Sequence, residues 1–321
     1  MKATIAMMLA AGLALFSGGC GPKERPFRIE LLKYLENSYT RSFEGSLRKG
    51  LEEAGLAEGK DYVLRARSAQ GDMTTLAMLV DSAENAGADL LVTFQSPTLY
   101  AAIQRAPETK KIFTLLQNPF VLGAGDSDAN HLPNLTGFYL VPPYEELLDK
   151  IEECRPPIRT LGTIYDPSNE DSADRKAELE RMAAERNIQV ETMPYSAQNE
   201  IAMAAEALAG KKPGGILHLQ DPAQDATFPA LYKAASRRKV PVFSLVANME
   251  KIGAAITCTT DREEIGGRFA QMVVRIAKGE DPTYMPFEND RELRKRFGYN
   301  RTVAIDAGMV LPESLAGAGG E

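Results

Sequence analysis

The chain has 321 residues, of which 44% are hydrophobic and 25% are charged, and its formal net charge is −7. This composition is typical of a soluble globular protein that is long enough to form two hydrophobic cores. The negative charge repels nucleic-acid phosphates, and no block of lysine or arginine is broad enough to reverse it, so we do not expect nucleic acid as a partner.

The first segment of the chain has the features of an export signal. Lys2 precedes an apolar run at residues 3–16, which is shorter than the roughly 20 apolar residues of a membrane span. Small residues then lead to Cys20, an arrangement that resembles a bacterial lipoprotein signal. We therefore expect residues 1–19 to be a signal peptide and Cys20 to carry lipid. Simple secretion remains the alternative, because Ser17 stands where lipoprotein signals usually carry Leu.

Strand and helix patterns alternate through the rest of the chain. A polar tether at residues 20–26 comes first. Strands are then predicted at 28–35, 61–68, 89–94, 111–117, 135–140, 159–166, 188–196, 214–221 and 240–247. Helices are predicted between them, at 42–55, 74–87, 97–106, 142–154, 172–187, 199–210 and 229–239.

This alternation predicts an α/β fold with two Rossmann-like lobes, because parallel strands must be joined by right-handed crossovers rather than by tight hairpins. We expect a hinge between the lobes and a ligand cleft between them. The N-terminal lobe is predicted to contain residues 27–140 and 254–281. The C-terminal lobe is predicted to contain residues 141–253 and 282–318.

Polar residues follow most of the predicted strands. In open parallel sheets, ligands bind beyond the carboxyl ends of the strands, where helix N-termini expose free N–H groups. The candidate ligand-binding residues are therefore Ser38, Tyr39, Gln95, Ser96, Gln117, Asn118, Tyr165, Asp166, Asp221 and Asp261.

Two of these positions suggest how a charged ligand is held. Ser96 suits an N-cap and Pro97 suits the first helical position, so the helix start offers N–H groups to a carboxylate. Alternatively, Ser96 only caps the helix. Asp166, Asp221 and Asp261 could receive an ammonium group or could act as caps and turn residues. The aromatic rings of the candidate tyrosines would add stacking surface.

Motifs typical of enzymes and metal sites are missing from the sequence. The two histidines lack metal-ligand spacing, and no dinucleotide-binding glycine motif, P-loop or nucleophile elbow follows a strand. Cys154 and Cys258 are interpreted as buried thiols. The charged run at 169–186 is interpreted as a solvated helix face. We predict no catalytic residue, no metal and no cofactor.

Five segments in a fixed order carry a resemblance to a known family. They are GLEEAGLAEGKDY (50–62), DLLVTFQSPTLYAA (89–102), KIFTLLQNPFVLGAG (111–125), NLTGFYL (134–140) and NRTVAIDAGMVLPESL (300–315). Together they resemble substrate-binding lipoproteins of ABC transporters, in the group that includes tryptophan- and phenylalanine-binding members with the type I periplasmic binding protein fold.

This resemblance implies a ligand clamped between two lobes that close about a hinge, with no chemistry on the ligand. It also implies delivery to ABC permease subunits by a lipid-anchored monomer in the periplasm or on the outer face of a bacterial membrane. By position, Ser96 corresponds to a family Thr, Asn118 to a family Asp, and Asp261 to an acid before a late helix. Gln95 and Gln117 flank the first two positions.

The sequence departs from the family at two places that bear on the ligand. The loop ENSYTRSF lacks a His-Pro pair, and Asn118 replaces a carboxylate by a neutral amide. An aromatic amino acid is the predicted ligand, with its carboxylate near Ser96 and its ammonium near Asp221 or Asp261. The alternatives are a ligand-sensing or lipid-carrying protein with a cleft lined by Phe94, Phe120 and Leu122, and an enzyme on the same scaffold.

Overall fold

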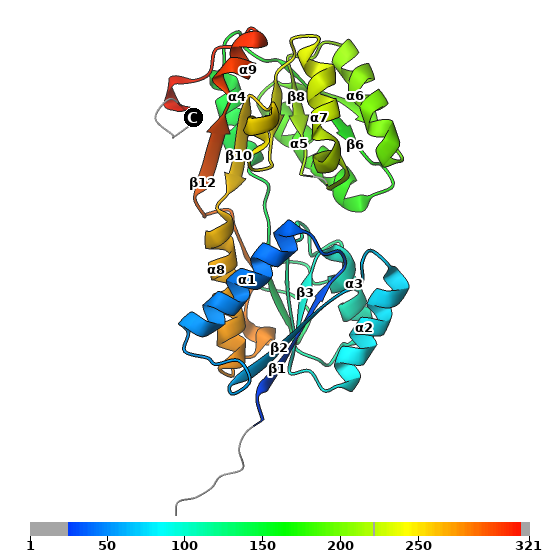
Figure 1. The fold of residues 1–321 in the computed structure, drawn as a ribbon, viewed down its shortest axis with the longest axis vertical. Helices are drawn as coiled ribbons and strands as arrows, with labels where there is room; N and C mark the ends of the chain where they lie inside the picture. The colour runs from blue at the N-terminus through cyan, green and yellow to red at the C-terminus, as the bar shows by residue number, and fades with distance from the viewer. Residues whose placement is uncertain (1–24, 221, 316–321) are drawn as a thin grey trace, which may run out of the picture.

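A computed structural model describes residues 25–220 and 222–315 of the chain. Two α/β lobes lie one above the other along the long axis of the molecule (Figure 1). Each lobe contains a six-stranded sheet, in the orders β11-β5-β4-β3-β1-β2 and β12-β10-β9-β8-β6-β7. The predicted signal peptide, Cys20 and most of the predicted tether lie outside the described residues. Within those residues, no helix is long and apolar enough to cross a membrane.

The N-terminal lobe has an entirely parallel sheet with helices on both faces. Its strands are β1 (Phe27–Lys33), β2 (Tyr62–Ser68), β3 (Leu90–Phe94), β4 (Lys111–Thr114), β5 (Leu135–Tyr139) and β11 (Glu288–Asn289). Its helices are α1 (Ser38–Glu53), α2 (Met73–Asn85), α3 (Ser96–Arg105), α8 (Arg262–Ala277) and the 3-10 turn η3 (Pro282–Tyr284).

The C-terminal lobe repeats this plan, with the antiparallel strand β12 added at one edge. Its strands are β6 (Thr160–Tyr165), β7 (Gln189–Pro194), β8 (Gly215–His218), β9 (Val242–Ser244), β10 (Ile256–Thr260) and β12 (Lys295–Tyr299). Its helices are α4 (Tyr144–Glu153), α5 (Glu170–Glu185), α6 (Ile201–Gly210), α7 (Pro222–Ser236) and α9 (Arg301–Asp306), with 3-10 turns η1 (Gln198–Glu200), η2 (Met249–Ile252) and η4 (Glu313–Leu315).

Helix α1 shows how the local sequence specifies these elements. Asn37 and Thr40 form a reciprocal capping box that satisfies two of the free N–H groups at the helix start. Phe43, Leu47 and Leu51 then recur at intervals of four residues and are all buried. This apolar stripe packs beside α8 against the sheet (Figure 1). The start of α1 is thereby fixed at the edge of the cleft.

The lobe boundaries differ from the predicted ones in two places. Residues 256–260 form β10, which hydrogen-bonds to β9 and β12, so this segment belongs to the C-terminal lobe rather than to the N-terminal lobe. Residues 288–289 form β11, which pairs with β5 and therefore belongs to the N-terminal lobe. A two-residue strand has too little pattern to be recognised in the sequence, and β10 leads directly into a helix of the other lobe.

The chain crosses between the lobes three times: from β5 to α4, from β10 to α8, and from β11 to β12. Asp290 connects the first and third crossings, because its Oδ1 accepts a 2.6 Å hydrogen bond from the Val141 N–H. The Lys295 Nζ donates to the carbonyl oxygens of Asp290, Arg291 and Leu293. These hydrogen bonds tie the first and third connecting segments to each other.

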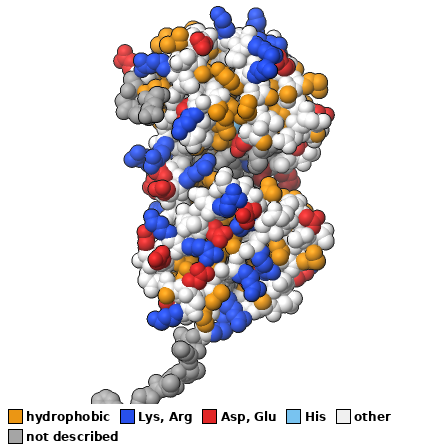
Figure 2. Space-filling view, in the orientation of Figure 1, with side chains coloured by type: hydrophobic (Ala, Val, Ile, Leu, Met, Phe, Trp, Pro, Cys, Tyr) orange, Lys and Arg blue, Asp and Glu red, His pale blue; other side chains and the backbone are white. Residues whose placement is uncertain are grey.

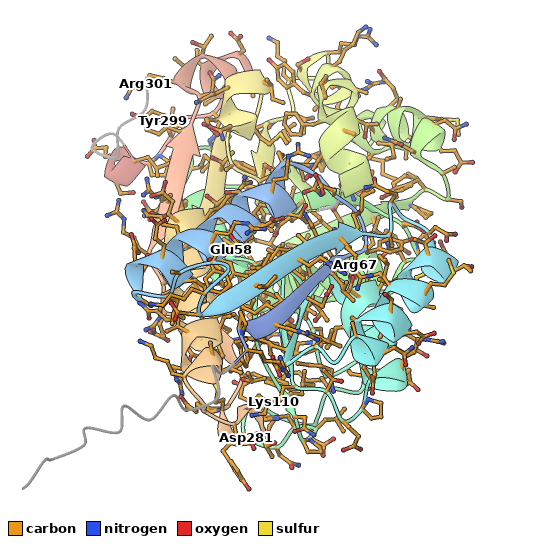
Figure 3. All side chains as sticks on the ribbon, turned by 60° about the horizontal axis from the view of Figure 1, so that its bottom comes forward. Glu58, Arg67, Lys110, Asp281, Tyr299 and Arg301 are labelled. Carbon is orange, nitrogen blue, oxygen red and sulfur yellow. The ribbon has the colours of Figure 1, made fainter. Side chains whose placement is uncertain are left out.

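The outer surface carries side chains of both charges. Figure 2 shows Lys, Arg, Asp and Glu side chains interspersed over the N-terminal lobe, and the two lobes meeting at a narrower waist. Figure 3 shows Lys110 and Asp281 close together at the end of the N-terminal lobe that is remote from the other lobe, and Tyr299 and Arg301 on the C-terminal lobe. Figure 2 also shows hydrophobic side chains gathered on the face of the upper, C-terminal lobe.

Candidate functional site

The junction between β3 and α3 lies where the two lobes meet, and neither Gln95 nor Ser96 is among the residues that line the cavities described below. Gln95 occupies the N-cap position with φ of 75°, and its side chain does not cap the helix. Instead, its Oε1 accepts a 2.9 Å hydrogen bond from the Leu35 N–H, which ties the end of β3 to the loop after β1. A non-glycine residue with this backbone geometry is strained by about 1 kcal/mol or more. The hydrogen bonds of Gln95 with Leu35 and with the Thr114 carbonyl hold this conformation and thereby fix the start of α3 at Ser96.

Ser96 contacts the opposite lobe. Its Oγ donates to the carboxylate of Asp171 on α5, at 3.1 Å from Oδ2. The alternative that Ser96 only caps α3 is wrong, because Gln95 holds the N-cap position and Ser96 is the first helical residue. The start of α3 therefore faces a carboxylate that the protein itself supplies.

Asn118, after β4, makes a second contact between the lobes. Its Nδ2 donates to Asp174 Oδ2 at 3.3 Å, and its Oδ1 accepts from the Phe120 N–H at 3.1 Å. Asp171 and Asp174 lie in the charged run that the sequence analysis interpreted as a solvated helix face. Asp171 is half-buried against Ser96, which the interpretation did not anticipate, whereas Asp174 is exposed as expected and still contacts Asn118.

A cavity of about 620 Å³, which we call the interlobe cavity, opens between the lobes beside these contacts. It is lined by amide, aromatic and charged side chains of both lobes and of the hinge. Its polar and aromatic lining residues include Gln117, Asn118, Phe120, Tyr139, Glu145, Glu146, Asp174, Arg175, Glu178, Arg181, Arg291 and Lys295.

Two aromatic rings give the interlobe cavity an apolar side. Phe120 and Tyr139 meet edge to face, with ring centroids 6.0 Å apart. Burial raises the pKa of Tyr139, with nearby Asp128 acting in the same direction, so its hydroxyl stays neutral at physiological pH. The Tyr139 hydroxyl accepts a 2.9 Å hydrogen bond from the Asn289 side chain. The rings are thus held in place and can pack against a flat ligand group.

Tyr39 lies at a second and much smaller space between the lobes, of about 30 Å³. The Arg262 guanidinium lies 4.6 Å from its ring centroid, and the Phe43 ring packs against it at 5.1 Å. Burial raises the pKa of Tyr39 to about 12, against smaller opposing effects of Arg262 and of a hydrogen bond with Gln220. This space holds about one water molecule and is too small for an amino acid.

The predicted residues of the second half are mostly engaged in local structure. The Lys176 ammonium lies over the Tyr165 ring, 5.4 Å from the ring centroid, in a cation–π contact. Asp166 accepts hydrogen bonds from the backbone and hydroxyl of Ser168, as a turn residue does. Asp261 caps α8 through the Glu263 N–H and pairs with Arg296.

Three further predictions have different outcomes. Ser38 is the exposed first residue of α1 and lines neither space described above. Asp221 lies outside the described residues. The prediction that Phe94 lines an apolar cleft, as in a lipid carrier, is wrong. Phe94 is fully buried in the core of the N-terminal lobe, where its ring packs against Phe43 and Phe269.

Two polar residues that are absent from the predicted site lie near it, His218 at the end of β8 and Arg175 on α5. His218 is in the predicted strand 214–221, and its Nδ1 lies 2.9 Å from Ser244 Oγ while its Nε2 lies 3.4 Å from Asp225 Oδ1. Arg175 was hidden within the charged run on α5, although it lines the interlobe cavity. Arg175 is four residues after Asp171 and therefore lies on the same face of the helix. The sequence alone does not reveal that this face meets the other lobe.

Metal and thiol chemistry receive no support from the geometry. Residues 25–220 and 222–315 contain no group of three or more His, Cys, Asp or Glu side chains placed to hold a metal ion. Cys154 and Cys258 are both buried free thiols, as predicted. Burial raises the pKa of Cys154 to about 11, which keeps its thiol protonated and unreactive.

Comparison with known proteins gives a consistent family. The family model described as "ABC transporter substrate binding protein" matches residues 28–320. A tyrosine-binding protein of Clostridioides difficile (strain R20291) is 23% identical over 239 residues, covering 74% of this chain and 69% of that protein.

Solved structures are similar over nearly the whole chain. A Streptococcus pneumonia ABC domain in complex with L-Trp has a TM-score of 0.80 at 21% identity, covering 92% of this chain and 99% of that one. A ligand-free, open substrate-binding protein with adhesive properties from Clostridium difficile has a TM-score of 0.73 at 22% identity, covering 89% and 96%. The predicted two-lobe fold of the type I periplasmic binding proteins is confirmed.

Proposed function

The chain belongs to the ABC transporter substrate-binding protein family, and from this premise we propose that it binds an aromatic amino acid in the interlobe cavity for an ABC importer. Members of this family bind a small solute outside the cytoplasm, work with ABC permeases and are not enzymes. The prediction that the chain has no enzymatic activity is confirmed by this membership. The solute, its site and the importer are the proposed parts.

The observation that carries the proposal is the combination of groups around the interlobe cavity. Its volume of about 620 Å³ lies within the range of ordinary small-molecule sites, roughly 300 to 1,000 Å³. Phe120 and Tyr139 provide aromatic surface, Gln117 and Asn118 provide amides, and side chains of both charges are present. An amino acid with an aromatic side chain carries the complementary groups.

The relatives support the same class of ligand. One curated relative is a tyrosine-binding protein, and one structural neighbour was solved in complex with L-Trp. The charged lining of the interlobe cavity favours an amino acid over the apolar cargo of a lipid carrier. A sensing role would use the same binding step, and it differs only in the partner that reads the closed state.

We further propose that Cys20 is lipidated after removal of residues 1–19 and holds a monomeric protein at a bacterial membrane. The apolar run and the small residues before Cys20 support this proposal. Lipid on Cys20 would keep the binding lobes close to the permease, while the lobes themselves remain in water.

A thermal-shift screen tests the proposed ligand. The purified protein is heated with each of the twenty amino acids, with small organic acids and with lipids. A ligand at 100 times its Kd stabilises the native state by about 2.7 kcal/mol, so an aromatic amino acid should raise the Tm clearly. A shift caused only by lipids or by non-aromatic solutes would contradict the proposal. Co-purification with permease subunits from membranes would then separate transport from sensing.

A further inference from the structure

Arg175 on α5 is an arginine in the interlobe cavity without a partner. It lines the cavity and is only partly exposed, and its Nε is buried and makes no hydrogen bond. No hydrogen bond or ion pair joins its guanidinium to any residue in the described ranges, 25–220 and 222–315. Of the five N–H donors of the guanidinium, the buried Nε–H is the one that neither the protein nor open solvent satisfies.

The neighbouring carboxylates are engaged elsewhere. Asp174 accepts from Asn118 in the opposite lobe. Glu178, one turn further along α5, pairs with Arg181 at 2.8 Å. A buried polar group without a partner costs about 1 to 3 kcal/mol, and a charged group costs more. A site that leaves such a group unpaired is explained when a bound ligand completes it.

We propose that Arg175 binds the carboxylate of the ligand and thereby selects carboxylate-bearing solutes, an inference that rests on the proposed function. A guanidinium and a carboxylate form two parallel hydrogen bonds, which fixes the orientation of the ligand as well as its charge. Arg175 is in the C-terminal lobe, so the contact also couples ligand binding to closure of that lobe over the N-terminal one.

This assignment replaces the carboxylate site predicted at Ser96. The Ser96 hydroxyl at the start of α3 is already used by Asp171, whose negative charge would repel a ligand carboxylate placed there. Among the cations that line the interlobe cavity, Arg181 pairs with Glu178 and Lys295 lies 3.9 Å from Glu146. Arg175 and Arg291 have no ion pair among the described residues, and of these two Arg291 is exposed whereas Arg175 has a buried Nε. Ser96 therefore contributes a contact between the lobes, and Arg175 binds the ligand carboxylate.

The rest of the interlobe cavity fits the other parts of an aromatic amino acid. Glu145 and Glu146, in the first turn of α4, offer carboxylates to an ammonium. Phe120 and Tyr139 offer their rings to an aromatic side chain. With Arg175 on the carboxylate, each of the three groups of the ligand has a partner of matching chemistry in one cavity.

Isothermal titration calorimetry with ligands that lack one group at a time tests the role of Arg175. The ligands are L-phenylalanine, L-tyrosine and L-tryptophan, phenethylamine, which has no carboxylate, and 3-phenylpropionate, which has no ammonium. The variant is Arg175→Gln. The matched control is Arg268→Gln, which removes the same charge from an exposed position on α8 that does not line the interlobe cavity.

We expect Arg175→Gln to weaken amino-acid and 3-phenylpropionate binding by about 10- to 100-fold and to leave phenethylamine binding unchanged. Arg268→Gln should bind every ligand as the natural protein does. Without ligand, Arg175→Gln should melt at the same temperature or higher, because an unpaired charge has been removed. A merely structural role would lower the melting temperature and weaken all ligands alike.

The outcomes separate the inference from the proposed function. If the natural protein binds an aromatic amino acid and Arg175→Gln binds it within about threefold, the inference is overturned while the proposed function stands. If 3-phenylpropionate binds in an Arg175-dependent way but no amino acid does, the proposed ligand is wrong and the inference holds. If no carboxylate binds the natural protein, both are overturned.

Discussion

Ser96 in the N-terminal lobe and Asp171 in the C-terminal lobe are joined across the cleft, with the serine Oγ 3.1 Å from Oδ2 of the carboxylate. Asn118 in the N-terminal lobe makes a second such contact, with its Nδ2 3.3 Å from Oδ2 of Asp174, which is on α5 like Asp171. Hydrogen bonds between lobes exist only when the lobes are closed, so both pairs bias the protein toward its closed form. A ligand that contacts both lobes would add its own stabilisation of the closed form to that of these two contacts.

The coupling between Ser96 and Asp171 can be measured by a double-mutant cycle. Ser96→Ala and Asp171→Ala should each shift the protein toward the open form, and the double variant should shift it by less than their sum. We expect a coupling free energy of about 0.5 to 1.5 kcal/mol, the range of one hydrogen bond. A fluorescence-transfer distance between the lobes reports the open and closed populations. If the shift of the double variant equals the sum of the two single shifts, Ser96 and Asp171 are not coupled, and a direct contact is contradicted. Single shifts no larger than that of the exposed control Ser38→Ala would contradict it as well.

Close packing of α1 on α8 predicts a strong effect at Gly50. A Cβ at this position would lie 2.3 Å from the Ala270 Cβ, which is shorter than side chains tolerate. Gly50→Ala should therefore lower the free energy of unfolding by about 1 to 3 kcal/mol. Gly45→Ala is the matched control, since Gly45 is in the same helix and a Cβ there meets nothing within 4 Å.

The control should be neutral or stabilising by up to about 1 kcal/mol, because alanine is the better helix former. Urea unfolding of both variants measures the difference. Equal stability of the two variants would show that the helices can separate without cost, and that the α1–α8 contact does not hold the N-terminal lobe together.

The hinge residue Asp290 makes stability depend on pH in an unusual direction. Burial raises the pKa of Asp290 above its ordinary value, while its hydrogen bond from Val141 and the nearby Lys295 oppose the shift. Between the unfolded and the folded pKa, the native state binds more protons than the unfolded state, so this residue's contribution to stability falls as pH rises. Asp290→Asn keeps an acceptor for Val141 and does not titrate.

We therefore expect Asp290→Asn to gain stability relative to the natural protein as pH rises from about 4 to 7. Asp72→Asn is the contrasting control, because hydrogen bonds from Thr75 lower the pKa of Asp72. Its depressed folded pKa contributes stability that is fully present above the unfolded pKa and is lost as pH falls through the folded pKa, so Asp72→Asn should lose stability relative to the natural protein as pH rises from about 2 to 5. Urea unfolding at several pH values measures both trends, and trends of the same sign would contradict the assignment for Asp290.

Lipidation at Cys20 predicts a change of location rather than of binding. The natural protein should partition into the detergent phase of a phase-separating detergent and remain with membranes after salt washing. Cys20→Ser should appear in the aqueous phase, with ligand affinity unchanged, because the binding lobes do not include that residue. Intact-mass measurement checks the acyl chains directly. An unmodified Cys20 in a membrane-free protein would leave simple secretion as the explanation.

The order of strands and helices could be read from the sequence because buried strands such as Leu90–Phe94 are short apolar runs with clear boundaries. Places where tertiary contacts decide the outcome were harder. Helix α7 begins at Pro222, although the pattern suggested Pro229, which instead lies inside the helix. The two-residue strand β11 and the lobe that receives β10 depend on pairing partners far away in the chain.

The candidate site was predictable only in part, for a physical reason. Strand ends drew attention to Ser96 and Asn118, which both contact the other lobe, since parallel strands bring their carboxyl ends to one edge of a sheet. Their partners Asp171 and Asp174 come from the other lobe, and nothing in a helical charge pattern tells which face will meet a second domain. Arg175 could not be predicted for the same reason. A sequence does not show that the Nε of one arginine is buried without a hydrogen-bond partner.

The most direct test of the account is calorimetric titration of the purified protein with L-tyrosine, L-tryptophan and L-phenylalanine, followed by recovery of the ligand. The account predicts saturable binding of at least one of them at one molecule per chain, with the ligand recovered unchanged. Absence of binding by all three, or chemical conversion of the ligand during the titration, would contradict an aromatic amino-acid-binding protein.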